Sequence, residues 1–451
     1  MTAFEILIIV LQFVLSLSLL IILHEMGHMI PARIFKMRVE KFFLFFDVKF
    51  ALLKKKIGET VYGIGWLPLG GYVKISGMID ESMDKEQMAQ PPQPWEFRSK
   101  PAWQRLIVML GGVIVNFILA WLIYVGMMYT WGEQILASKD IGKALAVSEF
   151  MTEKTGLQTG DEVVSIDGEG FESFNEMAMG LLFAETIKIR RDGQEMDLQV
   201  PEDFIGQLVD TNAETRPIGF RGPFLIAEIP DTSANAGKGL QVNDIVLDVD
   251  DRGLRYYDEI SDYIASKKDT VLQATVLRDG NTFTNPIYTN ADGKLAVIVT
   301  GAKLEDLGKL GFYNLSVKEY SFAESFGAGS KRFVKTFKDF GKQLKIMVTP
   351  STGAYKGVGS FISIAKIFPT TWDWEIFWKI TAFLSIMLGV LNLLPIPALD
   401  GGHAMFLIYE LVAGRKPGDK FMEYAQVVGF IFLISLFVFA FGNDIYRHFI
   451  K

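Results

Sequence analysis

The sequence predicts a polytopic α-helical membrane protein with four spanning helices and a large external segment built from two α+β domains. Half of the 451 residues are hydrophobic. Four apolar runs are each suited to a hydrocarbon core of about 30 Å, and one segment of the chain, 156–177, occurs again at 239–260. These three observations predict the fold class.

The four apolar runs cover residues 3–23, 106–130, 380–394 and 425–441. The third run is short, and it spans only if the tryptophan-containing segment 374–378 lies in the membrane interface. The first run could be a cleaved signal peptide, but it lacks a basic leading region and a small-residue cleavage pattern. We therefore expect it to be retained as a spanning helix.

The charge distribution predicts the topology. The net charge is −7, yet Lys and Arg crowd residues 33–105 and recur at Arg415, Lys416 and Lys420. The positive-inside rule places both basic loops in the cytoplasm and therefore puts residues 131–373 and both termini on the external side. The chain has no cysteine, which excludes disulfides and thiolate metal sites. We expect the bilayer as a partner, and no nucleic acid.

The external segment contains an internal repeat. GLQTGDEVVSIDGEGFESFNEM (156–177) aligns without a gap with GLQVNDIVLDVDDRGLRYYDEI (239–260), and each copy is followed by a strand-like stretch that ends in Arg-Asp-Gly. Each copy reads as a turn, a half-buried strand and a helix, at 174–183 and 257–266. This pattern resembles the circularly permuted PDZ domain of bacterial proteases, which implies binding of peptide termini. The alternative is two small β domains that only space the membrane helices apart.

Two further segments have recognisable patterns. Phenylalanines at spacings of three, four or seven predict an amphipathic helix over 321–347, whose apolar stripe we expect on the bilayer surface or on the repeated domains. The cytoplasmic loop has a strand-rich part at 59–78 and a Pro/Gln-rich linker at 89–95.

The stretch LLIILHEMGHMI (19–30) places ionisable groups at the inner end of the first apolar run. His24 and His28 are four residues apart, so on a helix they lie on one face and can both bind one zinc ion. Glu25 has the position of a general base toward a zinc-activated water. Ionisable residues within a membrane are costly and usually functional, although the three could merely mark the helix end in the interface.

A catalytic zinc site needs a third protein ligand. The segment NLLPIPALDGGHAMF (392–406) contains two prolines and two glycines, which break a helix at membrane depth where the backbone lines a cavity. Asp400 and His403 are both able to ligate zinc, and the residues alone leave the choice open. His448 is implausible because the predicted topology places it externally.

Together, His-Glu-x-Gly-His, Asn-x-x-Pro-x-Pro-x-Leu-Asp-Gly-Gly-His, the repeated domains and four spans resemble the site-2 protease family of intramembrane zinc metalloproteases over essentially the whole chain. The resemblance implies Zn²⁺ held by His24, His28 and Asp400, Glu25 as general base, and Asn392 in substrate engagement. It also matches 111–117 to a packing segment of the second helix and 59–78 to a membrane-associated β-loop. Residues 353–366 depart from the family pattern, so substrate-gating functions do not transfer to them.

The expected function is regulated intramembrane proteolysis in a bacterial inner membrane, with the active site near the cytoplasmic side. The expected substrates are single-span membrane proteins such as anti-sigma factors, together with signal-peptide remnants. An extended substrate could pair with an edge strand made of Gly71, Tyr72, Val73, Lys74 and Ile75. The rival interpretations are a catalytically inactive membrane PDZ scaffold and a transporter, although no inverted repeat is visible.

The predicted boundaries follow the chain in order. They are a first transmembrane helix with the zinc motif (1–30), a cytoplasmic loop (31–105), a second transmembrane helix (106–130), two PDZ-like domains (131–218 and 219–304), an external region (305–373), a third transmembrane helix (374–403), a cytoplasmic connection (404–424), a fourth transmembrane helix (425–441) and an external tail (442–451).

Overall fold

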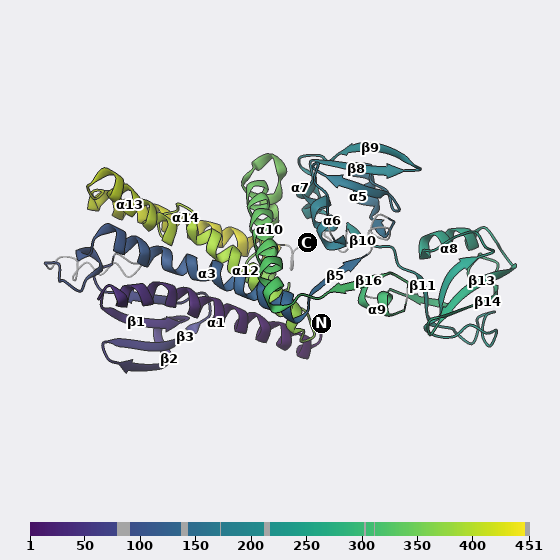
Figure 1. The fold of residues 1–451 in the computed structure, drawn as a ribbon, viewed down its shortest axis with the longest axis horizontal. Coiled ribbons are helices and arrows are strands. Elements are labelled where there is room, and N and C mark those ends of the chain that lie inside the picture. The colour runs from purple at the N-terminus through teal and green to yellow at the C-terminus, as the bar shows by residue number, and fades with distance from the viewer. Residues whose placement is uncertain are drawn as a thin grey trace. The chain divides into compact units, whose positions relative to one another are not determined.

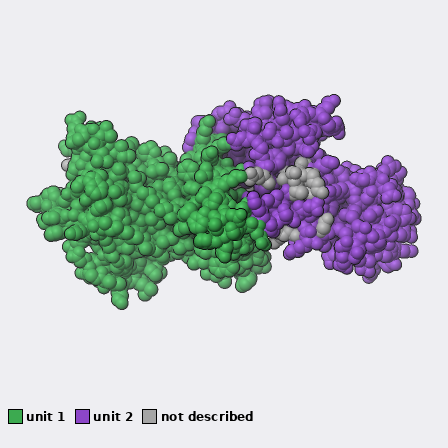
Figure 2. All heavy atoms as spheres, viewed as in Figure 1, with its two compact units in different colours: residues 1–132, 319–346, 357–451 green, residues 133–318, 347–356 purple. Residues whose placement is uncertain are grey.

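The computed structural model describes residues 1–78, 91–136, 143–171, 173–211, 217–301, 304–310 and 312–446. The chain divides into two compact units (Figure 2): unit 1 contains residues 1–132, 319–346 and 357–451, and unit 2 contains residues 133–318 and 347–356. Unit 1 is built from segments that precede and follow unit 2, so its contacts join residues far apart in the sequence.

Four long helices of unit 1 confirm the four predicted spans, because each is long and apolar enough to cross a membrane. They are α1 (Ala3–Ile34), α3 (Ala102–Thr130), α12 (Trp374–Leu393) and α14 (Asp419–Ile445), shown in Figure 1. The short third run reaches 20 residues because α12 starts at Trp374. Helix α1 continues well past its apolar run, so His24, Glu25 and His28 lie inside an unbroken helix.

Helices α1 and α3 approach each other closely through glycine. A Cβ on Gly27 of α1 would lie 2.4 Å from the carbonyl oxygen of Gly111, and a Cβ on Gly111 would lie 1.9 Å from that of Gly27. Small residues allow this backbone contact in membrane helices, where close packing replaces the hydrophobic effect as the driving force. The contact brings α3 against the turn of α1 that lies between the two histidines.

A four-stranded sheet follows α1 in unit 1. Its strands are β1 (Val39–Leu44), β2 (Phe46–Ile57), β3 (Thr60–Leu67) and β4 (Tyr72–Ile75), in the order β2-β3-β1-β4. Strand β1 pairs parallel with β3 and antiparallel with β4, with Phe42 opposite Val73. Strand β4 is thus the outer strand of the sheet among the described residues, as expected for an edge strand.

The phenylalanine-rich helix α10 (Phe322–Val348) packs on the spanning helices α3 and α12. The expected partners of its apolar stripe were the bilayer surface or the repeated domains. Phe333 and Phe337 contact Phe117 of α3, and Phe340 contacts Phe383 of α12. The indole of Trp121 donates a hydrogen bond of 2.9 Å to the Ser330 hydroxyl. Part of the apolar stripe is therefore buried against the spanning helices.

The segment that departs from the family pattern is anchored to α14. The short helix α11 (Phe361–Ala365) follows Ser360, whose backbone amide and hydroxyl donate hydrogen bonds of 2.8 and 2.5 Å to Asp444. The Ser363 hydroxyl donates to the second carboxylate oxygen at 2.5 Å. Asp444 is 1% exposed, so these bonds satisfy a buried carboxylate.

Unit 2 contains the repeat. Its first copy comprises β6 (Leu145–Val147), α5 (Glu149–Thr155), β7 (Glu162–Ile166), α6 (Phe174–Leu182), β8 (Thr186–Arg191), β9 (Gln194–Gln199), α7 (Phe204–Asp210) and β10 (Ile218–Phe220). The second comprises β11 (Phe224–Glu228), β12 (Ile245–Val249), α8 (Tyr257–Ala265), β13 (Val271–Arg278), β14 (Asn281–Tyr288) and β15 (Ile298–Thr300). The described strands form one five-stranded sheet in the second copy but two smaller sheets, β10-β6 and β7-β8-β9, in the first. Beyond the second copy lie α9 (Leu304–Lys309) and β16 (Leu315–Lys318), and β16 pairs with β5 (Glu133–Leu136).

Both copies carry the same buried ion pair. Arg191 donates two hydrogen bonds of 2.7 Å to Asp161 and one of 2.8 Å to the carbonyl of Gly156. Arg278 donates bonds of 2.6 and 2.7 Å to Asp244 and one of 2.7 Å to the carbonyl of Gly239, the matching glycine. The side chains of Asp161 and Asp244 are 2% and 0% exposed. The two copies of the repeat therefore share these polar contacts as well as their sequence pattern.

Candidate metal centre

Helix α1 presents two histidines toward the interior of unit 1. His24 and His28 are buried, at 8% and 6% exposure, and their Nε2 atoms lie 3.3 Å apart. Their spacing of four residues places them one above the other on the same face. Gly112 of α3 leaves room for both rings, because a Cβ there would lie 2.4 Å from His28 Nε2 and 2.6 Å from His24 Cε1.

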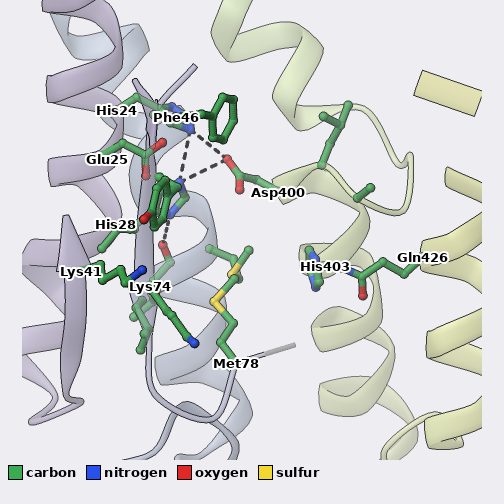
Figure 3. A pocket seen from close by; sticks show the side chains of 18 of the residues that line it. His24, Glu25, His28, Lys41, Phe46, Lys74, Met78, Asp400, His403 and Gln426 are labelled. Carbon is green, nitrogen blue, oxygen red and sulfur yellow. Dashed lines mark hydrogen bonds and ion pairs between the residues drawn. The ribbon is translucent and has the colours of Figure 1, made fainter. Parts of the chain in front are cut away.

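The third group of the cluster is Asp400. The chain leaves α12 at Leu393, passes two prolines, and starts α13 (Asp400–Ala413) with this aspartate. Its Oδ2 atom lies 3.2 Å from His24 Nε2 and 3.3 Å from His28 Nε2. Figure 3 shows the carboxylate directed at both imidazoles, whereas His403 lies further along α13. Among the described residues, the group able to hold a metal consists of His24, His28 and Asp400.

The spacing of these three atoms fits a zinc ion. Ligand bonds of about 2.0–2.1 Å in a tetrahedron separate neighbouring ligand atoms by about 3.3 Å. The three measured separations are 3.2, 3.3 and 3.3 Å. Two imidazoles and one carboxylate are also a donor set that catalytic zinc uses, with a further position left for water or substrate.

Hydrogen bonding supports the same assignment. The Nδ1 atom of His28 lies 2.8 Å from the carbonyl oxygen of Val108, which can only accept, so in the neutral ring that binds a metal the proton lies on Nδ1 and Nε2 carries a lone pair. Asp400 Oδ2 is buried and has no hydrogen-bond partner among the described residues. Lone pairs thus face each other, which costs free energy unless a cation binds between them.

Glu25 lies beside the metal ligands rather than among them. A Cβ on Gly71, the residue directly before β4, would lie 3.6 Å from Glu25 Cγ. This contact places the edge strand next to the predicted general base.

A cavity of about 490 Å³ connects these groups. It is lined on one side by α1 and β4 and on the other by the α12–α13 connection, α13 and α14 (Figure 3). The lining residues are His24, Glu25, His28, Lys41, Phe46, Asp47, Gly71, Tyr72, Val73, Lys74, Ile75, Met78, Val108, Met109, Ala398, Leu399, Asp400, His403 and Gln426.

The structure brings most of the sequence-predicted residues together. All five residues of the 71–75 stretch line the cavity. The side-chain nitrogen of Asn392 at the end of α12 lies 3.3 Å from His24 Nε2. His403 lines the cavity outside the ligand group, and His448 lies outside the described residues.

Sequence reasoning missed two contributions to this site. Asn116 of α3 lies 3.0 Å from His24 Nδ1, although its segment was matched only to a packing motif. Gln426 of α14 lines the cavity. A polar amide within an otherwise apolar spanning run is the signal that could have indicated both residues.

Comparisons with known proteins match nearly the whole chain. A family model described as peptidase family M50 matches residues 12–436. A Vibrio cholerae protein named "Putative zinc metalloprotease" is 27% identical over 466 residues, covering 96% of this chain and 98% of that protein. The regulator of sigma E protease of Haemophilus influenzae is 26% identical, covering 97% and 98%. The regulator of sigma-E protease RseP of Salmonella typhimurium is also 26% identical, covering 96% and 98%.

Proposed function

The chain belongs to peptidase family M50, and on this premise we propose that it cuts peptide bonds within the transmembrane segments of single-span membrane proteins. It is a multi-pass membrane protein and a zinc metalloprotease. One observation supports the intramembrane reaction above all: Asp400 meets His24 and His28 beside Glu25, and these last three residues lie on a helix long enough to span the bilayer.

The residues divide the chemistry among them. His24, His28 and Asp400 would hold the zinc, and the bound metal would activate a water and polarise the scissile carbonyl. Glu25 takes the proton of the attacking water and passes it to the leaving amine. Asn392 lies close enough to His24 for its amide to donate a hydrogen bond to the substrate carbonyl oxygen.

Strand β4 supplies the extended conformation that the reaction needs. A substrate helix satisfies all its backbone groups internally, so it must unwind before a peptide bond can reach Glu25. Strand β4 ends the described sheet, so an unwound segment can pair with its open edge by strand addition. Replacing both Val73 and Ile75 by proline should abolish cleavage while zinc binding remains; unchanged cleavage in the stably inserted variant would refute this step.

The repeated domains of unit 2 are proposed to be PDZ-like and external. We infer from the positive-inside rule that two basic loops lie in the cytoplasm: the loop that follows α1 and the loop between α13 and α14. The active site then lies near the cytoplasmic side of a bacterial inner membrane, and the repeat lies on the opposite side. We propose residues 131–218 and 219–304 as the domain boundaries.

Two roles are open to the repeated domains: binding a newly exposed peptide terminus, or excluding substrates with bulky external parts. Deleting residues 140–300 distinguishes them. Cleavage of intact, bulky substrates by the deletion variant supports exclusion, whereas loss of cleavage of trimmed substrates supports recruitment.

Two relatives carry the names "Regulator of sigma E protease" and "Regulator of sigma-E protease RseP". On this basis we propose anti-sigma regulators as substrates. Single-span segments left from signal peptides have the same chemistry and are proposed as a second class.

The decisive experiment compares the purified protein with its Glu25→Gln variant in lipid. The wild type should bind about one zinc and cut a model single-span substrate, and a strong chelator should stop cleavage. Glu25→Gln should keep the zinc but lose about 10²–10⁴-fold in rate, because the general base is removed. A variant that cuts at the wild-type rate contradicts the mechanism, and a wild type that gathers partners without cutting favours the scaffold.

A further inference from the structure

Asn116 is a fully buried amide in the second spanning helix. It is 0% exposed, and its Nδ2 atom lies 3.0 Å from His24 Nδ1. Its Oδ1 atom is buried and has no hydrogen-bond partner among the described residues. A buried carbonyl oxygen without a donor costs about 1–3 kcal/mol, so this arrangement calls for an explanation.

Exchanging the amide oxygen and nitrogen of Asn116 replaces the donor next to His24 Nδ1 by an acceptor. The two atoms have nearly the same size, and their assignment follows from the hydrogen-bond network. In the exchanged orientation Oδ1 lies next to His24 Nδ1 and accepts its proton. The unpaired buried oxygen then has a donor.

The second histidine shows why this orientation is the consistent one. His28 already has an acceptor at Nδ1, the Val108 carbonyl at 2.8 Å, which leaves its Nε2 free of a proton. His24 Nε2 faces both His28 Nε2 and Asp400 Oδ2, as a metal ligand does. It must therefore carry a lone pair too, and its proton must lie on Nδ1, where Asn116 is the neighbour.

We propose that Asn116 is a positioning residue for zinc: its Oδ1 accepts a hydrogen bond from His24 Nδ1 and so holds the tautomer and ring orientation in which Nε2 binds the metal. Helix α3 then supplies the acceptor for the Nδ1 proton of each histidine: the backbone carbonyl of Val108 for His28 and the side-chain oxygen of Asn116 for His24. The inference rests on the proposed zinc site. Partners of this kind typically contribute 10–100-fold to metal affinity.

A merely structural interpretation makes a different prediction. Hydrogen bonds between membrane helices average about 0.6 kcal/mol, so a packing residue would change stability slightly and leave zinc affinity unchanged. Zinc affinity and thermal stability, measured on the same variants, therefore separate the two interpretations.

The experiment uses the full-length protein in detergent, with zinc affinity measured by competition against a chromophoric chelator. Asn116→Leu should weaken zinc binding by about 10–100-fold. Asn116→Asp keeps an acceptor at the same position and should stay within about threefold of the wild type, because carboxylates are common partners of ligating histidines. Gln12→Leu is the matched control, since Gln12 is a 0% exposed amide of α1 that bonds to Pro369 far from the metal ligands.

Three results would decide against the proposal. If Asn116→Leu binds zinc like the wild type, Asn116 does not position His24. If Asn116→Asp loses as much affinity as Asn116→Leu, the amide donates to His24 instead of accepting. If the wild type itself holds no zinc, the proposed site fails and this inference fails with it, whereas the first two results leave the zinc site intact.

Discussion

The candidate metal centre of unit 1 and the ion pairs of unit 2 both contain buried carboxylates. The free-energy cost of burying these carboxylates is offset in different ways. Asp161 and Asp244 each receive two hydrogen bonds from an arginine on a strand of the same domain. Asp400 instead faces two imidazole nitrogens that come from the other end of the chain. The first arrangement is complete within the protein, whereas a bound cation would complete the second.

The difference shows how buried charge can be interpreted. A carboxylate paired with a bidentate arginine has its lone pairs satisfied, so it indicates structure. Converging lone pairs, with backbone or side-chain partners behind them, indicate a ligand.

The largest effect is expected from removing a ligand. Asp400→Ala and His24→Ala should each abolish stoichiometric zinc binding and cleavage, because two remaining ligands cannot hold a catalytic zinc. His403→Ala should keep the metal, since His403 is outside the ligand group. Metal analysis of the purified variants measures this. Full zinc occupancy in Asp400→Ala would contradict the assignment of the third ligand.

A smaller effect is expected from breaking a repeat ion pair. Asp244→Ala removes the carboxylate that accepts two hydrogen bonds from Arg278 and should destabilise unit 2, because the two bonds are charge-assisted and Asp244 itself is buried. Zinc binding in unit 1 should not change. Hydrogen exchange of β12 and β13 measures the loss, with exposed Asp231→Ala as control. Equal protection in the two variants would show that the pair is not structural.

A methyl group on α3 tests how tightly the imidazoles are held. Gly112→Ala places a Cβ 2.4 Å from His28 Nε2, so the rings must shift, and zinc affinity should fall by roughly tenfold. Gly126→Ala on the same helix meets no atom within 4 Å among the described residues and should bind zinc normally. Equal affinities of these two variants, measured by chelator competition, would mean that the site adapts to the methyl group.

The smallest effect is expected on the stability of unit 2 when the pH is lowered. Burial raises the pKa of Glu259, but hydrogen bonds from the Arg255 and Tyr256 amides and from Arg221 outweigh it, so the pKa of Glu259 is lowered in the folded state. A lowered pKa adds stability that is fully present above the ordinary value of 4.5 and lost as the pH falls through the folded value. Thermal unfolding of unit 2 from pH 7 to pH 3 should show this loss. Glu259→Gln should lose less on acidification, and an identical pH dependence would exclude Glu259 as a source.

Local patterns in the sequence determined much of this protein. The four spans follow from the length of apolar runs, and the shared face of His24 and His28 follows from helical spacing. These features depend on residues within a few turns of one another, and hydrophobicity and periodicity report on that range. The duplicated domains likewise follow from an ungapped repeat.

Only the tertiary structure decided which distant groups meet. The residues alone left Asp400 and His403 as equal candidates for the third ligand, and the break between α12 and α13 places Asp400 at the imidazoles. Asn116 and the Val108 carbonyl become partners of the histidines only through the glycine contact between α1 and α3. Such contacts depend on how helices pack across the whole chain, and the spacing of residues along the sequence carries no record of that packing.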